Sequence, residues 1–76
     1  MVTVLRHGAL RVVIFKDDHS PAHMHVFGDG EAKIDISGPA PRLILSTMRR
    51  GELRRASALV AGHQAFLLDE WRKHHG

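Results

Sequence analysis

The stretch HMHVFGDGEAKID, residues 23–35, decides the fold. Apolar and polar side chains alternate on both sides of its GDG turn, which is typical of two antiparallel strands. If the turn is a three-residue loop, Met24 faces Ile34 and His25 faces Lys33 across the hairpin. This register gives one apolar face and one polar face, whereas a two-residue turn would mix them. The sequence therefore predicts a hairpin that buries one of its faces.

Further strands flank this hairpin wherever β-branched and apolar residues cluster. We expect strands over residues 2–6, 9–15, 22–27 and 32–37, with a short strand over residues 43–45. A long helix is expected over residues 49–73, because apolar residues recur there with a period near 3.6. The expected fold is α+β, a small antiparallel sheet of four to five strands with one long C-terminal helix packed on one face. That helix should cover the apolar face of the hairpin and leave the histidine face open.

Length and composition limit what the chain can be. Its 76 residues predict a single domain, 1–76, because two folded units would need more chain. The absence of cysteine excludes disulfides, zinc–thiolate sites and cysteine nucleophiles. The lack of a membrane-spanning run and of a signal-peptide pattern predicts a cytoplasmic protein. Because a core of this size supplies only a few kcal/mol, we also expect a homodimer, a partner protein or a bound metal.

Histidines concentrate in the segment DDHSPAHMH, residues 17–25. His23 and His25 are two apart on a predicted strand, so their side chains point the same way. His19, in the preceding loop, could curl back toward them. Three imidazoles with an open position suit a catalytic-type zinc, nickel or copper site. Asp35, expected opposite His23, would then orient that ring as an outer partner.

Two other interpretations of the same residues remain open. In the first, His23 and His25 act as general acid and base of a metal-independent ribonuclease, with Lys33 holding a phosphate. In the second, the histidines have a structural role and tie the loop to the backbone. His19 separates the metal site from the ribonuclease, because chelation requires it and a two-histidine nuclease does not. Whether the chain is an enzyme stays open at this point.

A second candidate site lies in the basic half of the chain. Residues 40–76 carry seven basic and three acidic groups, and the whole chain has a formal charge of +3. Five arginines lie at or before the start of the expected helix: Arg42, Arg49, Arg50, Arg54 and Arg55. Cations there oppose the helix dipole. They could bind the phosphates of a nucleic acid or an acidic protein surface, or they could form an ordinary solvated face.

Residues 19–26, HSPAHMHV, resemble the signature of the bacterial family called domain of unknown function 4160. Members of that family carry Asp-His-x-Pro-Pro-His-Phe-His-Val after a first β-hairpin. The apolar stripe of the expected helix, which ends at Trp71, agrees with the family pattern as well. Two departures from it matter. Ala22 replaces the second proline, and Arg49 stands where the family usually has the proline that starts the helix.

The resemblance implies little chemistry, because the family is named for having no known function. Its genes are often beside those of another small family, domain of unknown function 2442, in an arrangement similar to toxin–antitoxin modules. The leading hypothesis is therefore a small bacterial protein that contacts a partner from a neighbouring gene. An exposed histidine face would be its functional surface. The ribonuclease and the metal-binding protein are the alternatives.

Overall fold

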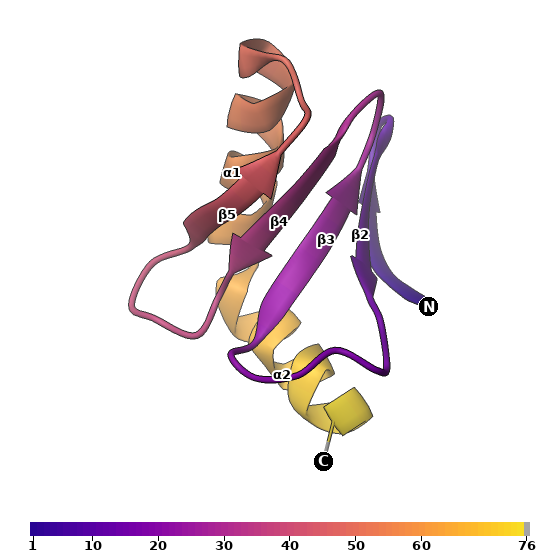
Figure 1. The fold of residues 1–76 in the computed structure, drawn as a ribbon, viewed down its shortest axis with the longest axis vertical. Helices are drawn as coiled ribbons and strands as arrows, with labels where there is room; N and C mark the ends of the chain where they lie inside the picture. The colour runs from indigo at the N-terminus through magenta and orange to yellow at the C-terminus, as the bar shows by residue number, and fades with distance from the viewer. Residues whose placement is uncertain (76) are drawn as a thin grey trace.

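The computed structural model describes residues 1–75. The chain forms β1 (Val2–His7), β2 (Leu10–Ile14), β3 (His23–Phe27), β4 (Glu31–Asp35), β5 (Arg42–Ser46), α1 (Arg50–Gly62) and α2 (Gln64–His75). The five strands make one antiparallel sheet in chain order, so each strand pairs with its neighbours in sequence. Both helices lie behind this sheet in Figure 1, one after the other. The expected α+β class and the sheet are confirmed.

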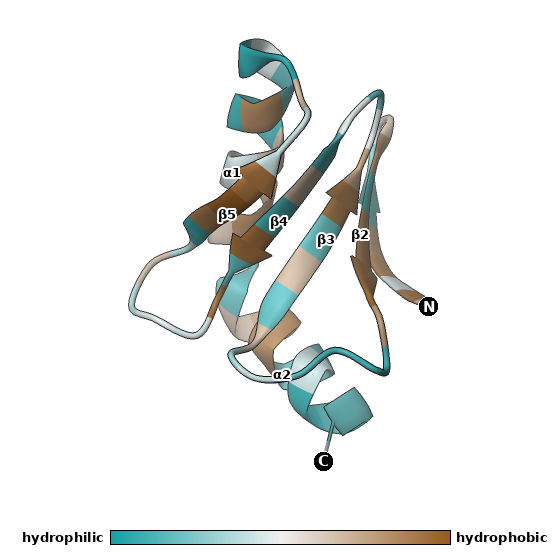
Figure 2. Cartoon of the chain, viewed as in Figure 1, coloured by the Kyte–Doolittle hydropathy of each residue, from teal (hydrophilic) through white to brown (hydrophobic). Residues whose placement is uncertain are grey.

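The central hairpin has the register that the alternating pattern predicts. Met24 pairs with Ile34 and His25 pairs with Lys33. Gly28 donates its N–H to the carbonyl of Gly30 at 2.9 Å and closes the loop between the strands. Hydrophobic and hydrophilic residues alternate along β3 in Figure 2. The apolar half of this alternation therefore faces the helices and forms the centre of the core.

The core lies between the apolar face of the sheet and the two helices. The largest fully buried side chains of this core come from β2, β3, β4, the residue that follows β4 and both helices: Val12, Ile14, Met24, Val26, Ile34, Ile36, Val60 and Leu67. Val12 pairs with Val26 across β2 and β3, so the two strands place their apolar side chains on one face. Trp71 closes the core on α2 and is 7% exposed.

The expectation of one long helix is wrong, because the chain forms helices of 13 and 12 residues. They are separated by His63, whose backbone leaves helical geometry at φ −128° and ψ 21°. Gly62 precedes the break, and glycine weakens a helix by about 1 kcal/mol relative to alanine. Gln64 then starts α2 and donates its side-chain amide to the carbonyls of Ile36 and Gly38, at 3.0 and 2.9 Å. Neither helix, within the described residues, has the length and apolar content that crossing a bilayer requires.

Strand β5 forms one edge of the sheet and is aliphatic on its surface. Leu43, Ile44 and Leu45 are 44–51% exposed, and the edge is strongly hydrophobic in Figure 2. The pairing with β4 shifts register there, because Lys33 pairs with Leu45 and Ile34 with Leu43. Ile44 is the extra residue between these two pairs. The sequence predicts this strand at residues 43–45, inside the observed range.

The loop of the central hairpin packs against the β5–α1 connection with no room for a side chain. A Cβ atom at Gly30 would lie 2.9 Å from the carbonyl oxygen of Thr47 and 2.9 Å from Cα of Met48. We expect Gly30→Ala to lower the free energy of unfolding by roughly 1–3 kcal/mol, as in other overpacked sites. Urea denaturation measures this loss.

Gly62→Ala is the matched control, because a Cβ there meets nothing within 4 Å. This helical substitution should leave stability unchanged or raise it by up to about 1 kcal/mol. Equal losses in the two variants would contradict the steric explanation.

Candidate functional site

The β2–β3 connection, residues 15–22, brings Asp18 against two histidines of β3. Asp18 donates its N–H to the carbonyl of Phe15 at 3.1 Å, which closes a turn and reverses the chain. Oδ2 of Asp18 then lies 3.0 Å from Nε2 of His23 and 3.0 Å from Nε2 of His25. One donor atom from each of the three side chains lies within 4.8 Å of the others. This spacing fits ligands of one metal ion.

His23 is the most buried member of this group, at 5% exposed. Its Nδ1 lies 2.9 Å from the carbonyl oxygen of Pro21. A carbonyl can only accept, so Nδ1 carries a proton. The other nitrogen, Nε2, is buried near Asp18 yet has no hydrogen-bond partner among the described residues. In the ring tautomer that donates Nδ1–H to Pro21, Nε2 presents its lone pair toward Asp18.

His25 is half-buried and approaches two carboxylates. Its Nε2 is hydrogen-bonded to Asp18, and its Nδ1 lies 3.7 Å from Oε2 of Glu31. Nδ1 is also buried without a hydrogen-bond partner in the described chain. The edge of the His25 ring meets Phe15, with centroids 4.5 Å apart. These contacts hold the ring so that Nε2 points toward the same oxygen as Nε2 of His23.

Aromatic side chains of α2 cover this group from the side of the helix layer. The ring centroid of His23 is 5.1 Å from that of Trp71, and His75 stacks on Trp71 at 3.7 Å. His75 also reaches the β2–β3 connection, where its Nε2 lies 3.2 Å from the carbonyl oxygen of Phe15. The C-terminal end of α2 thereby meets the end of β2 and the start of β3, as the crossing at the base of Figure 1 shows.

The expectation of an open histidine face is wrong for His23, because the β2–β3 connection and α2 cover its side chain. Asp18 occupies the third place of the group, and sequence reasoning missed it. His19 is exposed and lies outside the group of three. Two signals for Asp18 were available, its place in the acidic pair DD and the Asp that opens the family signature quoted above.

Lys33 and Asp35, which were also predicted on the histidine face, lie outside the group formed by Asp18, His23 and His25. Lys33 lies beside His25 across the β3–β4 pair, as expected. The carboxylate of Asp35 accepts from the hydroxyl and the backbone N–H of Ser37, at 2.6 and 2.8 Å, and from Arg42 at 3.3 Å. The Ser37 hydroxyl, then its N–H, and then Arg42 hold the pKa of Asp35 below its ordinary range. Asp35 thus stabilises the end of β4 rather than orienting His23.

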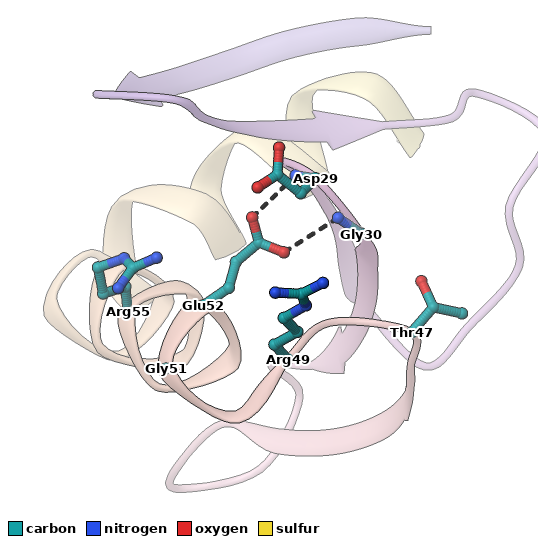
Figure 3. Close-up of a pocket in the computed structure, with 7 residues that line it drawn as sticks. All are labelled: Asp29, Gly30, Thr47, Arg49, Gly51, Glu52 and Arg55. Carbon is teal, nitrogen blue, oxygen red and sulfur yellow. Dashed lines mark hydrogen bonds between the residues drawn. The ribbon is translucent and has the colours of Figure 1, made fainter.

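The five arginines do not form one patch. Arg42 stands at the start of β5 with Asp35, at the opposite end of that strand from α1. Arg49 and Arg55 line a cleft of about 650 Å³ at the start of α1, on either side of Glu52 (Figure 3). Arg50 and Arg54 are exposed on α1. Each basic side chain in the cleft therefore faces a carboxylate as well as solvent.

Glu52 connects α1 to the loop of the central hairpin. Its carboxylate accepts the backbone N–H groups of Asp29 at 2.8 Å and Gly30 at 3.0 Å (Figure 3). These two hydrogen bonds lower the pKa of Glu52, with the Asp29 bond the larger cause, and Arg55 and Arg49 lower it further. The sequence shows an acidic residue among arginines near a helix start and gives no sign of this loop contact.

The lowered pKa of Glu52 predicts a loss of stability in acid. A folded-state pKa below the ordinary value of about 4.3 means that the unfolded chain takes up the proton first. The stabilisation by Glu52 is therefore complete above that value and is lost as the pH falls through the lower folded pKa. Thermal unfolding midpoints of the parent and Glu52→Gln should differ at pH 7 and converge toward pH 3.

Asp69→Asn, which changes an exposed carboxylate of α2, is the control for this pH series. It should follow the parent at every pH. A difference between parent and Glu52→Gln that stays constant from pH 7 to pH 3 would contradict the role of the ionised carboxylate.

Comparison with known proteins identifies one family. No curated protein and no solved structure matches the chain. A family model described as domain of unknown function (DUF4160) matches residues 10–72, which is most of the chain. The matched range includes Asp18, His23 and His25 and extends just past Trp71. The chain therefore belongs to the family domain of unknown function (DUF4160), as its histidine signature predicts.

Proposed function

We propose that this protein binds one divalent transition-metal ion through Asp18, His23 and His25. Two imidazoles and one carboxylate form a donor set that zinc accepts in catalytic-type sites and that iron(II) accepts in oxygenases. Zinc is the first candidate, and nickel and copper also suit the imidazoles. In this proposal Asp18 is the third ligand, in place of His19, which the sequence suggested.

The observation that carries the proposal is the approach of two electron-rich atoms in a buried place. With Nδ1 protonated toward Pro21, the lone pair of His23 Nε2 faces Asp18 Oδ2 at 3.0 Å. Such atoms repel each other unless a cation lies between them, and repulsion is stronger where water is excluded. A second proton on the ring would turn the same 3.0 Å contact into an ion pair, although Nε2 has no hydrogen-bond partner among the described residues. A metal ion satisfies both atoms together.

The partners of the outer ring nitrogens support the same assignment. Histidines that bind metals through one nitrogen usually donate the other N–H to a backbone carbonyl or a carboxylate. Pro21 provides the carbonyl for His23, and Glu31 provides a carboxylate 3.7 Å from Nδ1 of His25. Metal binding at Nε2 of His25 would place the ring proton on Nδ1, on the side of Glu31.

The distances between donors suit a small ion. Ligands at the usual 2.0–2.1 Å from tetrahedral zinc lie about 3.3–3.4 Å from one another. Each Nε2 is already 3.0 Å from the carboxylate oxygen. Side-chain shifts on the order of 1 Å would complete the arrangement. Three protein ligands leave a fourth position open, where a bound water or a substrate oxygen would be polarised by the metal.

The burial of His23 favours metal binding over metal-free acid–base catalysis on RNA. A general acid or base must come within hydrogen-bond reach of its substrate. The His23 side chain is 6% exposed and its Nδ1 is engaged by Pro21. The toxin–antitoxin hypothesis requires a surface that binds a partner protein. Among the described residues, the exposed aliphatic edge of β5 is a candidate for such a surface. That edge indicates no particular partner and no reaction.

Zinc binding is the direct test, on untagged protein purified without metal-affinity resin. Isothermal titration calorimetry at pH 7 should give one zinc ion per chain, and native mass spectrometry should show the same ratio. Binding to the folded state alone also raises stability, by about 2.7 kcal/mol at a free zinc concentration of 100 Kd. A protein that stays metal-free with zinc, iron(II), nickel and copper would overturn the proposal.

Asp18→Asn is the most informative variant, because it preserves size and removes the anionic ligand. We expect zinc affinity to fall at least about 100-fold, since loss of a partner that only orients a ligand already costs roughly 10- to 100-fold. His19→Ala is the matched control in the same loop, and its exposed side chain should change affinity by no more than about threefold. Unchanged affinity in Asp18→Asn would contradict the assigned ligands.

A further inference from the structure

We propose that the open position of this metal centre receives a small oxyanion, a carboxylate or phosphate group, from a cavity beside α2. This inference rests on the proposed metal site. The cavity has a volume of about 290 Å³ and is lined by Asp18, His19, Ser20, Trp71, Arg72 and His75. Asp18 belongs to the cavity wall and to the metal group alike. Trp71, from the opposite wall, contacts the ring of His23.

The charge of the cavity favours an anion once the metal is bound. A divalent ion would more than neutralise Asp18, the acidic residue of the lining. Arg72 adds a permanent positive charge, and its planar fork of N–H groups matches the oxygens of carboxylates and phosphates. Arg72 is exposed on α2, so its guanidinium is available to an incoming ligand.

His75 lines the same cavity and is held there by backbone and aromatic contacts. Its Nδ1 lies 3.0 Å from the carbonyl oxygen of Trp71, and its Nε2 lies 3.2 Å from that of Phe15. The His75 ring stacks on Trp71 with 14° between the planes, so both rings are fixed at the wall of the cavity.

The size of the cavity limits the ligand. A volume of 290 Å³ is just below the usual range for small-molecule pockets, which begins at about 300 Å³. It accommodates an oxyanion with a short organic group. The ligand class is therefore a small carboxylate or phosphate compound whose oxygen coordinates the metal while a second oxygen meets Arg72.

Cobalt(II) substitution tests this inference, because the visible absorption of cobalt reports changes in its ligands. Protein loaded with cobalt would be titrated with acetate and, separately, with methylphosphonate. We expect a saturable spectral change with at least one of the two probes. Arg72→Gln should lower the affinity for that probe at least about tenfold, as expected for loss of a charge-assisted contact. The affinity of the protein for cobalt should be unchanged.

Lys73→Gln is the matched control, since Lys73 is the next cation on α2 and lies 3.7 Å from Glu70 rather than in the cavity. It should bind the probe like the parent. Failure of cobalt, zinc and the other metals to bind would overturn the metal site itself. Cobalt binding without a response to either probe, or an equal effect of Arg72→Gln and Lys73→Gln, would overturn the oxyanion inference and leave the metal site standing.

Discussion

The two-residue alternation of side chains along β3 is the constraint on which the rest of the structure depends. Met24 and Val26 are fully buried under the helices, while His23 and His25 point to the opposite face. A slip of one residue would exchange the two sets and put imidazoles in the core. The hydrophobic free energy of the core thus fixes the direction of both histidines. A central strand with a neighbour on each side is also a rigid support for side chains that must converge on one point.

Carboxylates hold both ends of the central hairpin. Glu52 binds the backbone of the β3–β4 loop at one end, and Asp18 lies between the two histidines at the other. Neither residue belongs to the sheet. One comes from the helix layer and one from the connection between β2 and β3. The apolar layers determine how the sheet and the helices stack. The two polar contacts determine how the loops and the first turn of α1 lie against the sheet.

Periodic features were predictable from the sequence, and loop geometry was not. The register of β3 and β4 follows from which residues are apolar, because a wrong register would bury charges. The break at His63 escaped detection because the apolar stripe continues from Val60 to Leu67 across it. Asp18 was missed in favour of His19 because the direction of a side chain in a loop depends on a local turn, here the hydrogen bond to Phe15, which has no sequence period.

The exposed edge of β5 has a consequence for how the protein behaves at high concentration. Backbone groups on the outer side of an edge strand attract strands of other molecules, and aliphatic side chains such as Ile44 strengthen that contact. Arg42, the charge at the start of the strand, is already paired with Asp35 and gives the edge little protection of its own. Colloidal stability then depends on the net charge of +3. Salt weakens that repulsion, since the screening length is about 8 Å at physiological ionic strength.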